Sequence, residues 1–129
     1  MPINSKSKSI LLVDDDSDIV NLFKDLLENK NCEVIGFTNP LEALEHYKTN
    51  WNRYGLVISD IRMPVMNGFE FVRKARKINP KVKILLMTAF EINDKEFAQA
   101  LPKPKIDGLI RKPATSKEIL SIVSTVMKR

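Results

Sequence analysis

Five short apolar runs recur along the chain at nearly regular intervals, and most of their residues are Val, Ile and Leu. Runs of four to six such residues have the length of buried strands and are too short for core helices. The sequence therefore predicts five strands, at residues 9–13, 32–37, 56–59, 83–87 and 108–111.

Amphipathic segments follow these runs, with apolar residues repeating at the spacing of one helix face. Asp16 or Ser17 can cap the first helix. Asn39 followed by Pro40 is a cap and first-turn pair that opens the second helix. Three more helices are expected after the loop at residues 63–68, over residues 93–101, and after Thr115 or Ser116.

A strand followed by a helix, repeated five times, predicts an α/β fold. Right-handed crossovers then give a doubly wound parallel sheet with helices on both faces. The 129 residues suit a single domain with its core at about residues 9–128, and we find no linker or repeat. The one cysteine, Cys32, is expected to be buried on the second strand and excludes an internal disulfide.

The composition bears on the binding partners and the cellular location of the protein. A net charge of +5 favours an anionic partner, but the basic residues are spread along the chain without a helix-turn-helix or zinc-finger pattern. The sequence therefore argues against direct nucleic-acid binding. No apolar run is long enough to span a bilayer, and the first nine residues lack a signal-peptide core. With a single thiol, these features predict a cytoplasmic protein.

Polar residues whose side chains can bind ions or react stand where the predicted strands end. Asp14 and Asp15 follow the first strand, Asp60 follows the third, Thr88 the fourth and Lys112 the fifth. In a parallel sheet the carboxyl ends of the strands form one edge, and ligands bind there. We therefore expect these five side chains to converge.

Their chemistry suits a divalent cation and a phosphoryl group. Clustered carboxylates repel one another unless a cation neutralises them, and Mg²⁺ suits carboxylates combined with a phosphate. Asp60 could act as a nucleophile towards phosphorus, forming an acyl phosphate. Thr88 could donate a hydrogen bond to the phosphoryl oxygens, and Lys112 could place a positive charge on them. Asp16 is better explained as a helix cap.

Four motifs in this order resemble the receiver domain of two-component response regulators. The resemblance covers about residues 9–128, and any one motif alone would be weak. It implies the flavodoxin-like fold with strand order 2-1-3-4-5. The motifs are Asp14-Asp15, Asp60 before Met63-Pro64 and Asn67-Gly68, Thr88-Ala89, and Lys112-Pro113.

The resemblance also implies a Mg²⁺ site. Asp60 matches the phosphoacceptor, and Asp15 and Asp60 match the carboxylates that bind the metal directly. Asp14 matches the acid that acts mainly through water, and the backbone carbonyl of Arg62 matches the third protein ligand.

The resemblance further implies a switch. Thr88 matches the hydroxyl that moves towards the phosphate, Lys112 matches the phosphate-binding lysine, and the Lys112-Pro113 peptide is expected to be cis. A histidine kinase or phosphotransfer protein would phosphorylate Asp60. Phosphorylation would then shift a surface made by the fourth helix, fifth strand and fifth helix. The protein would catalyse only its own phosphorylation and dephosphorylation, as a monomer or a phosphorylation-dependent dimer with an unidentified output partner.

The chain departs from the receiver pattern at several positions. Leu109 stands where receivers usually carry an aromatic residue, so it is expected either to pack the last strand or to weaken coupling. Two prolines in residues 101–107 predict a stiff connection. Arg62 and Phe90 stand at positions that, in the receiver family, flank the path of attacking water, and a long cation and an aromatic ring there predict slow self-dephosphorylation of Asp60.

Two other functions compete with this interpretation. A pseudo-receiver would bind partners without phosphate, and Leu109 favours it slightly while the complete acidic site opposes it. A haloacid-dehalogenase-like phosphatase would use Asp14 to Asp16 as its nucleophile motif. It also needs a later acidic pair, and no convincing pair follows Lys112.

Overall fold

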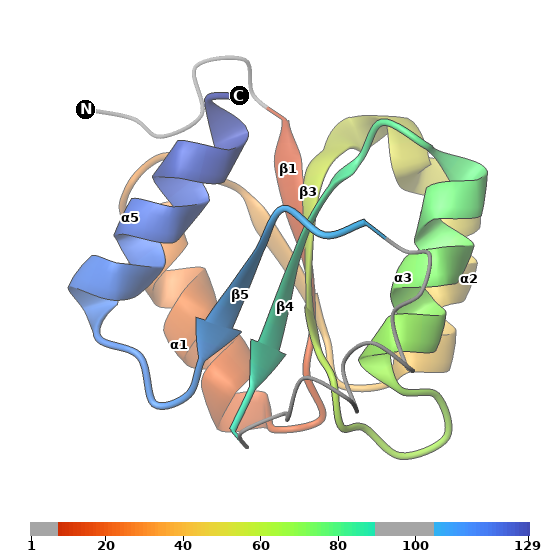
Figure 1. The fold of residues 1–129 in the computed structure, drawn as a ribbon, viewed down its shortest axis with the longest axis horizontal. Helices are drawn as coiled ribbons and strands as arrows, with labels where there is room; N and C mark the ends of the chain where they lie inside the picture. Colours follow the sequence, from red (N-terminus) through yellow and green to blue (C-terminus); the bar gives the residue numbers. More distant parts are fainter. Residues whose placement is uncertain (1–7, 90–104) are drawn as a thin grey trace.

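The computed structural model describes residues 8–89 and 105–129, and within them five strands and four α-helices form (Figure 1). The strands are β1 (Ser9–Val13), β2 (Val34–Phe37), β3 (Tyr54–Asp60), β4 (Lys83–Thr88) and β5 (Gly108–Arg111). The helices are α1 (Ser17–Glu28), α2 (Pro40–Asn50), α3 (Gly68–Ile78) and α5 (Ser116–Met127), with a short 3₁₀ helix, η1 (Trp51–Arg53), before β3.

The strands form one parallel sheet in the order β2-β1-β3-β4-β5, which confirms the expected topology. The register keeps the strand ends in step, because Val13 pairs with Ser59 and Thr88 pairs with Arg111. All five strands therefore end at the same edge, towards which the arrowheads of β4 and β5 point in Figure 1.

Helices cover both faces of the sheet. In Figure 1, α1 and α5 lie on one side and α2 and α3 on the other. Alternate residues of β1 serve the two sides: Leu11 joins the apolar cluster under α2 and α3, whereas Ile10 and Leu12 join the cluster under α1 and α5. A strand buried on both faces must be apolar throughout, which explains why the predicted strands read as continuous apolar runs.

Capping side chains decide where the first and last helices begin. The carboxylate of Asp16 accepts a hydrogen bond from the α1 backbone, so Asp16 rather than Ser17 is the cap. Thr115 rather than Ser116 caps α5, where its hydroxyl and the side chain of Glu118 form a reciprocal capping box. The cap of α2 by Asn39, followed by Pro40, is confirmed.

Three predicted strands have different bounds in the structure, and of these the fourth strand only extends by one residue, to Thr88. The second strand begins at Val34 rather than Cys32, because Cys32 still belongs to the turn after α1 and donates its N–H to the carbonyl of Leu27 at 3.1 Å. Cys32 is buried as expected, but it does not lie on a strand. The third strand begins at Tyr54, whose ring is buried in the core, and extends through Asp60.

Two other expectations concern the third and fourth helices. The loop predicted over residues 63–68 ends one residue earlier, because Asn67 caps α3 and Gly68 is its first residue. The helix predicted at residues 93–101 lies outside the described residues, as do Phe90 and both prolines of residues 101–107.

The described helices are 11 or 12 residues long, which corresponds to roughly 16–18 Å. Within the described ranges, none is long and apolar enough to cross a bilayer.

Candidate functional site

The fold brings the predicted polar residues to one edge. Asp14 and Asp15 directly follow β1, Asp60 ends β3, Thr88 ends β4 and Lys112 follows β5. One carboxylate oxygen from each of Asp14, Asp15 and Asp60 can be chosen so that all three lie within 4.8 Å of one another. The three acids therefore form one compact oxygen cluster.

Lys112 reaches into this cluster from the other side. Its ammonium Nζ lies 2.7 Å from Asp14 Oδ2 and 3.5 Å from Asp60 Oδ1. The Lys112-Pro113 peptide is cis, as the resemblance implied. The backbone N–H of Lys112 donates to the carbonyl of Thr88 at 2.7 Å, which extends the β4–β5 pairing up to the lysine. Sequence reasoning placed Lys112 near a phosphate but missed its contact with Asp14.

The carboxyl group of Asp60 is strongly perturbed by its surroundings. Asp60 is only 7% exposed, and its Oδ1 accepts a hydrogen bond from the backbone N–H of Ile61 at 3.0 Å. Burial, reinforced by the negative charge of Asp14, raises the pKa of Asp60 from 3.8 to about 6. The charge of Lys112 and the Ile61 N–H oppose this rise without cancelling it.

Lys112 is perturbed in the direction that keeps it charged. Burial alone would lower its pKa, but the hydrogen bond and charge of Asp14 and the charge of Asp60 outweigh burial, so the pKa is raised. The single ammonium of Lys112 therefore contacts the carboxylates of Asp14 and Asp60, and the carboxylate of Asp15 belongs to the same cluster. The unbalanced negative charge creates a need for a further cation.

The donor set fits Mg²⁺. All three side chains offer carboxylate oxygens, the ligands that hard divalent cations prefer. Asp15 is exposed, so it can bind a hydrated ion from solvent. Asp14 is fully buried, and its two oxygens are already engaged by the N–H of Asp16 at 2.9 Å and by Lys112. This engagement suits an indirect role for Asp14, through water.

The loop between Asp60 and α3 is closed by Gly68, the first residue of α3, which packs tightly against the backbone of Asp60. Gly68 donates its N–H to the carbonyl of Ile61 at 2.8 Å. A Cβ on Gly68 would lie 2.2 Å from the backbone oxygen of Asp60, so only glycine fits there. Arg62 lies exposed on this loop. The Asn-Gly dipeptide predicted a break in regular structure but gave no sign of this close approach.

Val65, on the same loop, is a feature that the sequence could not reveal. It has a φ of 75° and is 79% exposed. A β-branched residue disfavours this left-handed backbone conformation, and the exposed side chain gains little from burial. No sequence signal marks such a strained valine, because valine is the residue type least expected there.

Thr88 and Leu109, which the resemblance connects with a switch, lie on the neighbouring strands β4 and β5. Thr88 is 3% exposed at the end of β4, and Leu109 pairs in register with Leu86 on the same strand. Leu109 is half-buried against the cluster under α2 and α3, which confirms that it packs the last strand. It also lines an 860 Å³ groove along β5 and α5.

A second groove, of about 350 Å³, opens next to the acidic cluster and is mostly apolar. It runs between α1 and the segment that follows β5, and Leu22 on its rim is 49% exposed. Its lining includes Ile19, Leu22, Phe23, Lys112, Pro113 and Ala114. An exposed apolar groove beside charged side chains is typical of a protein contact, and sequence reasoning did not identify it.

Comparisons with known proteins agree with this geometry. Residues 10–124 match the family described as the response regulator receiver domain. The chain is 37% identical over 120 residues to the regulatory protein VanRB of Enterococcus faecalis, covering 93% of this chain and 52% of that protein. It is 37% identical over 83 residues to the chemotaxis protein CheY of Thermotoga maritima, covering 64% of this chain and 68% of that protein.

Solved structures show the same architecture. A receiver domain protein from Clostridium thermocellum superposes with a TM-score of 0.83 at 29% identity, and 95% of each chain is covered. The chain spans 28% of the phosphoglycerate transport regulator PgtA of Salmonella typhimurium and about half of VanRB, so these relatives are considerably longer.

Proposed function

Because the chain belongs to the receiver domain family of two-component response regulators, we propose that it works as a phosphorylation switch with Asp60 as the phosphoacceptor. The observation that carries the proposal is the oxygen cluster of Asp14, Asp15 and Asp60, with the ammonium of Lys112 at 2.7 Å from Asp14 and 3.5 Å from Asp60. This arrangement offers a nucleophile, a cation site and a positive charge for phosphoryl oxygens.

Mg²⁺ fits the cluster and, when bound, would neutralise charge on the carboxylates and the phosphoryl oxygens. Asp15, Asp60 and the backbone carbonyl of Arg62 would hold the ion, and Asp14 would act through water. The ionised Asp60 then attacks the phosphorus of a phosphohistidine. An oxygen–phosphorus bond forms, the nitrogen–phosphorus bond breaks, and the electron pair returns to the imidazole of the donor.

Two side chains would stabilise the acyl phosphate. Lys112 would turn from Asp14 towards the phosphoryl oxygens, since the new negative charge competes with that carboxylate. Thr88, at the end of the neighbouring strand, would donate its hydroxyl proton in a hydrogen bond. These two movements begin at the ends of β4 and β5, next to the groove lined by Leu109. They would therefore shift the population of a partner-binding surface there.

The phosphodonor would be a histidine kinase or a phosphotransfer protein. The apolar groove between α1 and Pro113 supports this assignment, because it lies beside Lys112 and offers contact area to a protein that approaches Asp60. The same phosphoryl chemistry would let the chain catalyse its own phosphorylation from small phosphodonors, and its own dephosphorylation.

The test is intact-mass analysis after incubation with Mg²⁺ and acetyl phosphate, with Asp60→Asn as the control. We expect one added phosphoryl group on the unchanged protein and none on the control. Failure of the unchanged protein to gain the group, although Mg²⁺ still binds, would favour a phosphate-independent binding module. Addition of a phosphoryl group to both proteins would mean that a residue other than Asp60 is the phosphoacceptor.

A further inference from the structure

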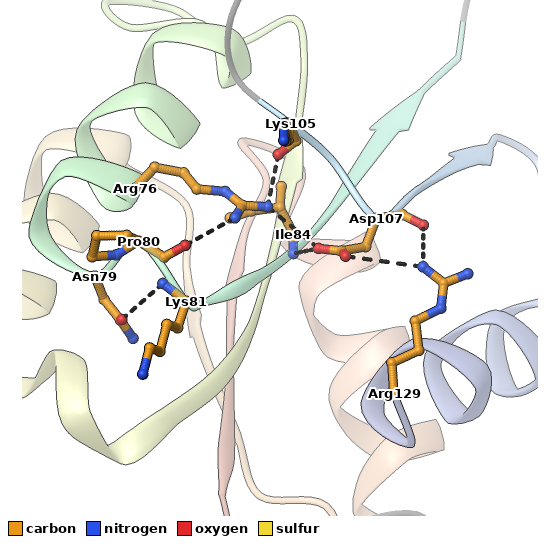
Figure 2. Close-up of polar contacts among 8 residues, drawn as sticks. All are labelled: Arg76, Asn79, Pro80, Lys81, Ile84, Lys105, Asp107 and Arg129. Atoms are coloured by element: carbon orange, nitrogen blue, oxygen red, sulfur yellow. Dashed lines mark hydrogen bonds and ion pairs between the residues drawn. The ribbon is translucent and has the colours of Figure 1, made fainter.

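Basic residues that are scattered in the sequence gather at the edge of the sheet opposite Asp60. They lie at the ends of α3 and α5 and at the starts of β4 and β5, and Figure 2 shows four of them. We call this group the basic corner: Arg76, Lys77, Lys81, Lys83, Lys105, Lys128 and Arg129. Asp107 is the one acid among these described segments, so the corner carries a net charge of +6, more than the +5 of the whole chain.

Asp107 is enclosed by the corner (Figure 2). Its Oδ2 accepts a hydrogen bond from the backbone N–H of Ile84 at 2.7 Å and one from Arg76 at 3.4 Å. Its Oδ1 lies 3.9 Å from Arg129 Nη1. Arg76 also donates to two main-chain carbonyls, at 2.7 and 3.1 Å. The single carboxylate and the guanidinium of Arg76 are therefore engaged within the fold, whereas Arg129 is 56% exposed and contacts Asp107 through Nη1 alone.

Four lysines of the corner are left facing solvent. Lys77, Lys81, Lys105 and Lys128 are exposed, and no ion pair or side-chain hydrogen bond joins any of them to another described residue. Lys77 and Lys128 lie at helix C-termini, where a cation is favourable in any protein. Lys81 and Lys105 lie in the turns that lead into β4 and β5, so no helix end explains them.

We propose that the basic corner docks an acidic segment of a partner protein. The free cations are all lysines, which are flexible point charges suited to the scattered carboxylates of an acidic segment. Arg76, whose planar fork would best fit a phosphate, is already bound to Asp107 and to two backbone carbonyls, and Arg129 pairs with the same Asp107. The described corner also offers no aromatic ring on which a nucleic-acid base could stack.

The location leaves the phosphorylation chemistry undisturbed. The corner lies at the start of β4, whereas Thr88 ends that strand, six residues in total and roughly 15–20 Å away. An acidic segment bound there would raise the association rate and local concentration of its protein while Asp60 stays accessible. The proposal does not depend on the chemistry of Asp60.

The experiment measures binding of a fluorescent polyglutamate peptide to the full chain by anisotropy, at low and at physiological salt. A thymidine oligonucleotide of equal charge is measured in parallel. The corner variant carries Lys81→Glu, Lys105→Glu and Lys128→Glu. The control variant has the same change in net charge at exposed lysines elsewhere: Lys24→Glu, Lys74→Glu and Lys117→Glu.

We expect the corner variant to lose about tenfold or more in peptide affinity, since three attractive charge contacts are removed and the reversed charges add repulsion. The control variant should lose much less. Equal losses in both variants would mean attraction by net charge alone, and absence of peptide binding would also overturn the proposal. If the oligonucleotide binds more tightly than the peptide and its binding depends on the corner, the partner would be a nucleic acid and the proposal of an acidic protein segment would be overturned.

A second variant set covers the case in which charge reversal disturbs folding. Lys→Gln at Lys81, Lys105 and Lys128 removes the charges without adding acids, and circular dichroism compares its thermal unfolding with that of the unchanged chain. A folded Gln variant that keeps full peptide affinity would equally reject the basic corner as the docking surface.

Discussion

Asp60→Asn should stabilise the metal-free protein at neutral pH. Burial and the charge of Asp14 make ionisation of Asp60 unfavourable in the folded state, where its pKa is about 6 instead of 3.8. Each pKa unit corresponds to about 1.4 kcal/mol, so the ionised carboxylate costs up to about 3 kcal/mol of folding free energy at neutral pH. Asparagine has nearly the same shape and removes this cost.

The pH dependence follows from the direction of the shift. A raised carboxyl pKa means that the folded state holds its proton more tightly than the unfolded state. The cost is therefore absent below about pH 4 and grows as the pH rises to about 6. The unchanged protein should lose stability relative to Asp60→Asn across this window, and the two should have nearly equal stability near pH 4.

The assay is thermal unfolding followed by circular dichroism in EDTA, across the acidic to neutral range. A gain of about 1–3 kcal/mol raises the midpoint by roughly 3–10 °C for a chain of this size. Added Mg²⁺ should narrow the gap, because the ion compensates the charge of Asp60 in the unchanged protein only. An Asp60→Asn protein that is no more stable at neutral pH, or equally more stable near pH 4, would refute the reasoning.

Three further predictions concern the loop beside Asp60 and the lifetime of the phosphoryl group. Val65→Asn should raise stability by about 1 kcal/mol in urea unfolding, because asparagine tolerates the positive φ better; a loss would show that the valine side chain is held by a contact. Gly68→Ala should cost about 1–3 kcal/mol and slow phosphorylation by acetyl phosphate, since the Cβ would meet the backbone of Asp60; unchanged melting and labelling would contradict this. Arg62→Asn combined with Phe90→Ala should shorten the lifetime of phosphorylated Asp60 severalfold, because the resemblance implies that these two positions tune hydrolysis; the decay of the phosphorylated mass measures it, and an unaltered lifetime would count against slow self-dephosphorylation.

The strand pattern was readable from the sequence because of a simple physical constraint. A parallel strand that is covered on both faces must be apolar, and a polar residue is tolerated only where the strand leaves the core. The runs at β1 and β4 show this most clearly, and their ends at Val13 and Thr88 locate the site edge. Two strand starts were predicted wrongly. Cys32 is buried but lies in a turn, and the third strand already begins at Tyr54, two residues before the apolar run at residues 56–59.

The sequence by itself determined which residues are chemically competent and which edge they occupy, because strand direction and side-chain type are local properties. Only the tertiary structure decided how they meet. The bond from Lys112 to Asp14 joins residues 98 positions apart, and the raised pKa of Asp60 depends on burial by the whole fold. The basic corner has the same origin: helices that return antiparallel to the strands bring their last turns, and the turns into the next strands, to the edge opposite the acids. These basic residues are far apart in the sequence, and only the topology of the fold brings them together.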